Sequence, residues 1–121
     1  MTNWTSARRP FVLPMVVIPE DIDAQDIASN IAILEWMNRA AIAHSTAEGY
    51  DWAAYRRLES MFVVRRHEID YHRSARLGEP LVLRTWPGYI KGASCRRYHE
   101  VTSLRDGALI ARGMNLWAYV G

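Results

Sequence analysis

The feature that most constrains the fold is a long and mostly apolar helical segment. From Asn30 to Thr46 the residues are good helix formers, and Ser29 or Asn30 can serve as the N-cap. The few polar side chains fall on one narrow stripe made of Glu35, Asn38, Arg39 and Thr46. A helix with so little polar surface must be covered on nearly all sides. We therefore expect a wide, curved sheet to wrap around it.

Five segments have the character of β-strands, one before the helix and four after it. They are Phe11 to Ile18, Met61 to Tyr71, Leu81 to Ile90, Ala93 to Leu104 and Ala108 to Val120. Lys91-Gly92 predicts a tight reversal, and Asp106-Gly107 predicts a two-residue hairpin turn between the last two strands. Asp51 to Glu59 is typical of a short second helix. This order predicts an α+β domain in which a single helix lies on an antiparallel sheet.

Length and composition limit the kinds of protein this chain can be. A chain of 121 residues is expected to form a single domain over residues 1–121, with residues 1–9 as a loose N-terminal segment. No apolar run reaches the roughly 18 residues of a membrane span, so we expect no membrane partner. A lone cysteine, Cys95, permits no internal disulfide and favours a cytoplasmic location. Its place in a predicted strand favours a small buried side chain over a nucleophile.

Several functional classes lack their motifs in this sequence. It contains no glycine-rich phosphate loop and no dinucleotide fingerprint, so we expect no cofactor. The four histidines fall on different predicted elements, and we expect no metal site. Of 15 basic residues, 14 are arginine, but the pairs Arg65-Arg66 and Arg96-Arg97 fall on predicted strands and send one side chain to each face. They form no continuous basic stripe, so we expect no nucleic-acid partner.

A carboxylate-rich loop runs directly into the start of the apolar helix. It holds Asp21, Asp23 and Asp26 within six residues. One interpretation is structural, because carboxylates are favourable near a helix N-terminus and form local Asx turns. The other is catalytic: unpaired amides at the helix start polarise a carbonyl while a carboxylate attacks it or activates a water. Thioester cleavage suits a carboxylate and unpaired amides, because a thiolate is a good leaving group and needs no strong general acid.

Several segments in this order resemble the hotdog-fold acyl-CoA thioesterases, and most closely the subgroup typified by 4-hydroxybenzoyl-CoA thioesterase. The resemblance covers Val12 to Val120. The matching segments are Asp21-Ile22-Asp23, Asn30, Glu35-Trp36-Met37, Phe62 to Tyr71, Ala75 to Glu79 and Trp117 to Val120. The resemblance implies a hotdog fold, with an antiparallel five-stranded sheet around one long central helix.

The resemblance also implies site residues and an assembly. The family's catalytic aspartate matches Asp23, as nucleophile or general base, and the amide that polarises the carbonyl falls at the backbone of Asn30. We expect Trp36 to contribute to the acyl pocket. An arginine suits the phosphates of an acyl-CoA substrate. Arg65 and Arg73 are our candidates for this contact, and the sequence also offers Arg66, Arg96 and Arg97. Protomers of this family pair edge to edge with active sites between them, which implies a homodimer or a homotetramer built as a dimer of dimers.

This sequence departs from the family pattern in the loop after Asp23. Many relatives have Gly-His-Val-Asn-Asn there, where this chain has Asp26-Ile27-Ala28-Ser29-Asn30, and Ile33 stands in place of a tyrosine. The charge of Asp26 lies close to the proposed site. We expect an acyl-CoA thioesterase, and the altered loop leaves open a catalytically silent protein that binds acyl thioesters. Acyl-thioester dehydration or hydration is disfavoured, because no histidine follows Asp23 until His44.

Overall fold

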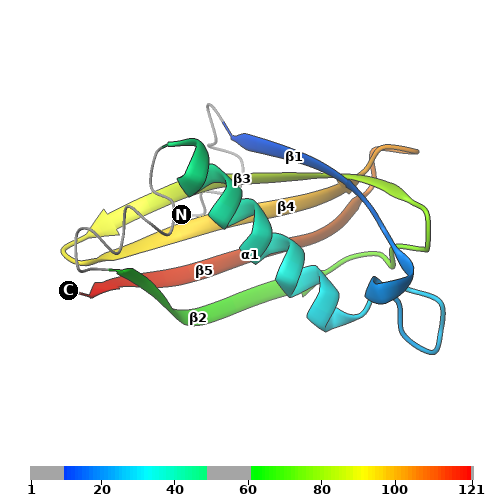
Figure 1. The fold of residues 1–121 in the computed structure, drawn as a ribbon, viewed down its shortest axis with the longest axis horizontal. Coiled ribbons are helices and arrows are strands. Elements are labelled where there is room, and N and C mark those ends of the chain that lie inside the picture. Colours follow the sequence, from blue (N-terminus) through cyan, green and yellow to red (C-terminus); the bar gives the residue numbers. More distant parts are fainter. Residues whose placement is uncertain (1–9, 49–60, 121) are drawn as a thin grey trace.

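The computed structural model describes residues 10–48 and 61–120, in which one long helix lies on a five-stranded antiparallel sheet (Figure 1). The elements are β1 (Phe11–Val16), η1 (Pro19–Asp21), α1 (Asn30–Ala47), β2 (Met61–Tyr71), β3 (Pro80–Lys91), β4 (Ser94–Ser103) and β5 (Leu109–Val120). The strand order is β1-β3-β4-β5-β2, which leaves β1 and β2 at the edges. This is the predicted α+β hotdog arrangement. In the described ranges, no helix is long and apolar enough to cross a membrane.

Two of the sequence predictions fall outside the part of the chain that the structure describes. They are the loose N-terminal segment at residues 1–9 and the short helix expected over Asp51 to Glu59. Both stay predictions. The four strands after α1 and the strand before it lie within two residues of their predicted bounds. Four consecutive strands after the helix would be expected to form a meander, but only β3, β4 and β5 do so, because β2 pairs with β5 and not with β3.

Helix α1 starts at a side-chain cap and buries one side against the sheet. The hydroxyl of Ser29 accepts a hydrogen bond from the amide of Ala32 at 3.0 Å, which satisfies one of the amides left open at the helix start. Trp36 and Met37 are fully buried. Ile31 and Ile42, however, point away from the sheet and are 70% and 62% exposed. The prediction that α1 is covered on nearly all sides is therefore wrong for the described residues, because the single sheet reaches only one side.

The core lies between α1 and the face of the sheet on which it rests, called here the helix face. Leu81, Leu83 and Val101 pack there with Trp36 and Met37 of the helix. At Gly113 in β5 the helix comes very close, because a Cβ placed there would lie 2.5 Å from the Sδ atom of Met37. Glycine at this position allows the close approach.

Strand β2 contains a bulge that changes which of its side chains share a face. In its register with β5, Val64 is opposite Trp117 and Arg66 is opposite Leu116, so Arg65 is the extra residue. Simple alternation along the strand predicts Val63 on the same face as Ile69 and Tyr71. The bulge shifts the phase by one residue and places Val64, not Val63, on the helix face with His67 and Ile69.

The connections between the last strands differ in detail from the predicted turns. Ser103 donates its amide to the carbonyl of Ala108 at 2.9 Å, so four residues, 104–107, form the β4–β5 loop and the predicted two-residue turn is wrong. Within this loop only Gly107 has a positive φ, of 71°, and the carboxylate of Asp106 accepts a hydrogen bond from the amide of Ala108. The preceding reversal is formed by Gly92 and Ala93, one residue later than predicted.

Candidate functional site

The acidic loop before α1 folds back on itself as a small hairpin. Asp23 donates its amide to the carbonyl of Ile27 at 2.9 Å, and Ile22 pairs with Ala28 in an isolated bridge. The turn between these partners includes Asp26 in the left-handed region, with φ of 62°. Glycine adopts this conformation without steric cost, and aspartate is among the side chains that tolerate it. The loop therefore keeps its turn despite the departure at Asp26.

The three aspartates of this loop have different surroundings. The carboxylate of Asp21 is buried and accepts a hydrogen bond from the amide of Ile18 at 3.0 Å, which gives it a structural role. Asp23 is exposed, and one of its oxygens accepts from the amide of Gln25 at 2.8 Å in an Asx turn. Asp26 is also exposed. Asp23 is thus the carboxylate that is both oriented by the loop and open to a ligand.

Asn30 is the first residue of α1 and lies at the same junction as the Asp23 hairpin. The amide of Ser29 donates to the carbonyl of Asp21 at 2.9 Å, which ties the helix start to the loop. Asn30 is exposed, and its amide belongs to the first turn, where amides have no partner within the helix. Among the described residues, no hydrogen bond joins the Asp23 carboxylate to Asn30. The hairpin positions Asp23 and helix α1 positions Asn30, and the Ser29–Asp21 hydrogen bond joins the hairpin to the helix.

A second loop, after β2, supports the first from the other side. Ala28 donates its amide to the carbonyl of Ala75 at 2.8 Å, and Ile27 pairs with Arg76 in an isolated bridge. These backbone contacts tie the Asp23 hairpin to residues 72–79. Apart from Arg73, sequence reasoning found no role for this segment beyond the family resemblance, because the contacts that tie it to the hairpin are made by the backbone.

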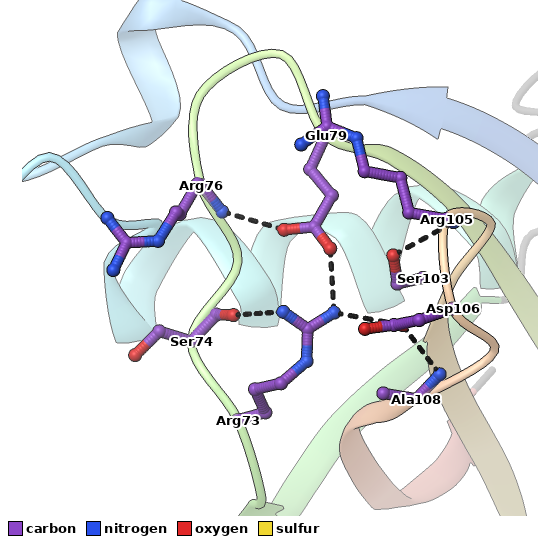
Figure 2. A network of polar contacts seen from close by, with 8 residues as sticks. All are labelled: Arg73, Ser74, Arg76, Glu79, Ser103, Arg105, Asp106 and Ala108. Atoms are coloured by element: carbon purple, nitrogen blue, oxygen red, sulfur yellow. Dashed lines mark hydrogen bonds and ion pairs between the residues drawn. The ribbon is translucent and has the colours of Figure 1, made fainter.

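Glu79 organises that second loop (Figure 2). Its side chain is buried, and its two oxygens accept from the amide of Arg76 at 3.0 Å and from the guanidinium of Arg73 at 2.7 Å. Burial alone would raise the pKa of this carboxyl, but hydrogen bonds from Ser103, from the Arg76 amide and from Arg73 outweigh burial and lower the pKa to about 2. Glu79 is therefore ionised and fixed at neutral pH.

The three predicted substrate-binding residues lie in different surroundings. Arg73 is bound to Glu79 and reaches Asp106 at 3.4 Å (Figure 2), so much of its charge is already paired. Arg65 is exposed at the bulge of β2. Trp36 is fully buried in the core cluster that also contains Ala28. In the described part of the chain, no hydrogen bond connects any of these side chains to the loop, and their roles stay predictions.

A set of polar side chains on the helix face was not predicted from the sequence. His67, Asn115 and His99 form a hydrogen-bonded series across β2, β5 and β4. Burial is the main reason that the pKa of His99 is lowered to about 4. Arg97 contacts His44 of α1 at 2.9 Å, and burial and the Arg97 charge lower the pKa of this histidine. Despite these histidines, no group of three or more potential ligands within residues 10–48 and 61–120 is placed to hold a metal ion.

Comparisons with known proteins show the family of this chain and its fold. Residues 17–121 match the family model described as the thioesterase-like superfamily. A 1,4-dihydroxy-2-naphthoyl-CoA thioesterase from Synechocystis has a TM-score of 0.87 at 14% identity, over 93% of this chain and 83% of its own. A Staphylococcus aureus protein solved in complex with CoA has a TM-score of 0.87 at 12% identity, with coverages of 93% and 70%.

A longer structure matches as well. A putative oleoyl thioesterase from Lactobacillus plantarum has a TM-score of 0.90 at 17% identity, over 99% of this chain and 46% of its own, so this chain spans about half of it. No curated protein sequence gives a significant match. The similar structures, all at low sequence identity, show the fold, and the match to the family model shows the family.

Proposed function

Because this chain belongs to the thioesterase-like superfamily, we propose that it hydrolyses an acyl thioester of coenzyme A to the free acid and the thiol. The observation that carries the proposal is the exposed Asp23 carboxylate, held by an Asx turn beside the open N-terminus of α1. A carboxylate and a set of unpaired amides are the two groups that acyl transfer from a thioester requires.

The chemistry follows from these two groups. The thioester carbonyl oxygen accepts a hydrogen bond from the Asn30 amide, which stabilises the negative charge that develops on this oxygen. Asp23 then removes a proton from a water that attacks the carbonyl carbon, or attacks that carbon itself. The carbon–sulfur bond breaks and the thiolate leaves. On the second route, water hydrolyses the resulting anhydride and regenerates the carboxylate.

The edge of the sheet supports a dimer as part of this proposal. β2 is an 11-residue edge strand, whereas β1 at the other edge has six residues. A long unpaired edge is a template for association with another strand. In the proposed homodimer two β2 strands pair, and each Asp23 loop faces the partner. Light scattering at micromolar concentration tests this, and a monomeric mass would contradict it.

For the coenzyme A phosphates, Arg65 is the better placed of the two predicted arginines. It is exposed in β2, whereas Arg73 would have to exchange its contacts with Glu79 and Asp106 for a phosphate. Trp36 is fully buried in the core, and we expect it to form part of the floor of the acyl pocket. We expect Arg65→Gln to raise KM for acyl-CoA with little change in kcat.

The proposal is tested by release of free thiol from short, medium, long and aromatic acyl-CoAs. Asp23→Asn should abolish turnover, and Asp26→Asn provides a matched control, since it removes the same charge from the same loop. A blank corrects for the thiol of Cys95. If Asp23→Asn turns over like the wild type, the assigned mechanism is wrong. If the wild type binds acyl-CoA without cleaving it, the chain is a silent acyl-thioester binding protein.

A further inference from the structure

The helix face of the sheet is divided into an apolar part and a polar part. The apolar part, with Leu81, Leu83 and Val101, lies under α1. Further along the same strands the side chains become polar, and His44 of α1 adds to them. The polar cluster consists of His44, His67, Thr85, Arg97, His99 and Asn115, contributed by α1 and four strands. Position along the strands therefore decides whether a ligand on this face meets carbon or hydrogen-bonding groups.

Three members of the polar cluster form a directional series. Asn115 Oδ1 contacts His99 Nε2, and Asn115 Nδ2 lies 2.6 Å from His67 Nδ1. An amide oxygen accepts and an amide nitrogen donates, so His99 carries its proton on Nε2 and His67 Nδ1 is an acceptor. The proton of neutral His67 is then on Nε2. The series thus begins in the core at His99 and ends in an N–H donor on His67, whose side chain is exposed.

This buried polar series makes the fold less stable than apolar packing in the same place would. His99 and Asn115 are both fully buried, and His99 Nδ1 has no hydrogen-bond partner among the described residues. Trp117, two residues beyond Asn115 on the same face, also has a buried ring nitrogen without a described partner. Unpaired buried polar groups destabilise, and apolar side chains would fill the space at less cost. What the polar groups do achieve is to fix the ring of His67 in one orientation.

The surroundings of His67 indicate the chemistry of a ligand. On the helix face its neighbours in β2 are Val64 and Ile69, which are apolar, and its neighbour in β5 is Asn115. The charged pair of Arg66 and Glu68 is on the opposite face of the strand. No carboxylate from the described strands shares the helix face with His67. An oriented N–H donor in a weakly polar setting suits an oxygen acceptor.

We propose that His67 Nε2 donates a hydrogen bond to an oxygen substituent on the acyl group, so that the preferred substrates carry a hydroxyl or keto oxygen beyond the thioester carbonyl. Asn115 and His99 are positioning residues that act through His67. The inference rests on the proposed function, because it takes the helix face to be where the acyl group lies. The same hydrogen bond favours both binding and turnover, so either a dissociation constant or kcat/KM can measure its effect.

The test compares acyl-CoAs of equal chain length with and without a hydroxyl or keto oxygen, placed at successive positions along the chain. The decisive variant is His67→Asn, whose amide oxygen takes the place of Nδ1 and keeps the contact with Asn115 while nothing replaces Nε2. His72→Asn, at an exposed histidine just after β2, is the matched control. We expect the wild type to favour the best oxygenated substrate in kcat/KM by about three- to tenfold, as for one uncharged hydrogen bond.

His67→Asn should remove this preference by lowering kcat/KM for the oxygenated substrate to that of the unsubstituted one, and it should leave the melting temperature unchanged. His67→Gln, whose amide nitrogen reaches the place of Nε2, should restore part of the preference. Asn115→Leu should also reduce the preference, although Asn115 itself does not contact the ligand in the proposed complex. Equal losses on both substrates in His67→Asn, or no loss on either, would overturn the proposal.

Failure of the proposed function can be distinguished from failure of this inference. If no acyl-CoA is cleaved, dissociation constants of the paired ligands for wild type and His67→Asn still show or refute the preference. If acyl-CoAs are cleaved through Asp23 without any preference for oxygenated acyl groups, the thioesterase stands and the role of His67 is refuted. If no acyl-CoA binds, both proposals fail.

Discussion

Replacing Glu79 by glutamine should destabilise the protein at neutral pH and have little effect in acid. The pKa of Glu79 is about 2, against 4.5 for an unperturbed glutamate, and each pH unit is worth about 1.4 kcal/mol. The interval corresponds to about 3 kcal/mol of stability from ionisation of this carboxyl. Because the folded pKa lies below the unfolded one, this stabilisation is complete above pH 4.5 and is lost as pH falls toward 2.

The expected difference between wild type and Glu79→Gln at neutral pH is about 2–3 kcal/mol, since the Arg73 side chain is 36% exposed and water screens part of the interaction. Glutamine keeps an oxygen for the Arg76 amide, so the variant should fold. Denaturation by urea, followed by tryptophan fluorescence at one fixed protein concentration, gives the free energy of unfolding at several pH values.

Glu68→Gln is the matched control, because it breaks an ion pair with Arg66 in which both side chains are more than half exposed. Its cost should stay below about 1 kcal/mol at any pH. A Glu79→Gln difference as small as that of the control, or one of equal size near pH 3 and at neutral pH, would refute the reasoning about this network.

Two further predictions concern the helix face. Gly113→Ala should lower the free energy of unfolding by about 1–3 kcal/mol, because its Cβ would displace the buried Met37 side chain. An unchanged thermal unfolding curve would contradict this, since it would mean that Met37 moves aside without loss of stability. For His99, burial lowers the folded pKa to about 4, below the usual 6.5 of a histidine, so stability should fall as pH drops from 6.5 to 4. His99→Gln should flatten melting temperature against pH in this window, and an equally steep profile would contradict the assignment.

Local chemistry explains which parts of the fold could be predicted from the sequence. The start of α1 was predictable because the cap needs only the Ser29 hydroxyl and an amide three residues later. The bounds of β2, Met61–Tyr71, match the predicted strand because its residues favour extended backbone throughout. The bulge at Arg65 was not predictable, since only the register with β5 reveals an extra residue.

The candidate site was predictable in position but not in detail. Three similar aspartates stand in the loop, and only the fold separates the buried Asp21 from the exposed Asp23. The polar cluster was missed because its contacts join distant residues: His67 and Asn115 are 48 positions apart, and no local pattern links them. The roles of Asp23 and Asn30 rest on the family resemblance and await the thiol-release assay.

The bulge in β2 decides where this strand can lose a residue. Deleting Arg65 would remove the extra residue and leave a regular strand, in which Val64 and His67 are two positions apart and both stay on the helix face. Deleting Glu68 would instead make His67 and Ile69 direct neighbours, so that one of them left the helix face. The 104–107 loop, exposed at the tip of its hairpin, carries no such constraint. Descendants of this sequence can therefore lose a residue at the bulge or at that loop, whereas the spacing of His67 and Ile69 is fixed.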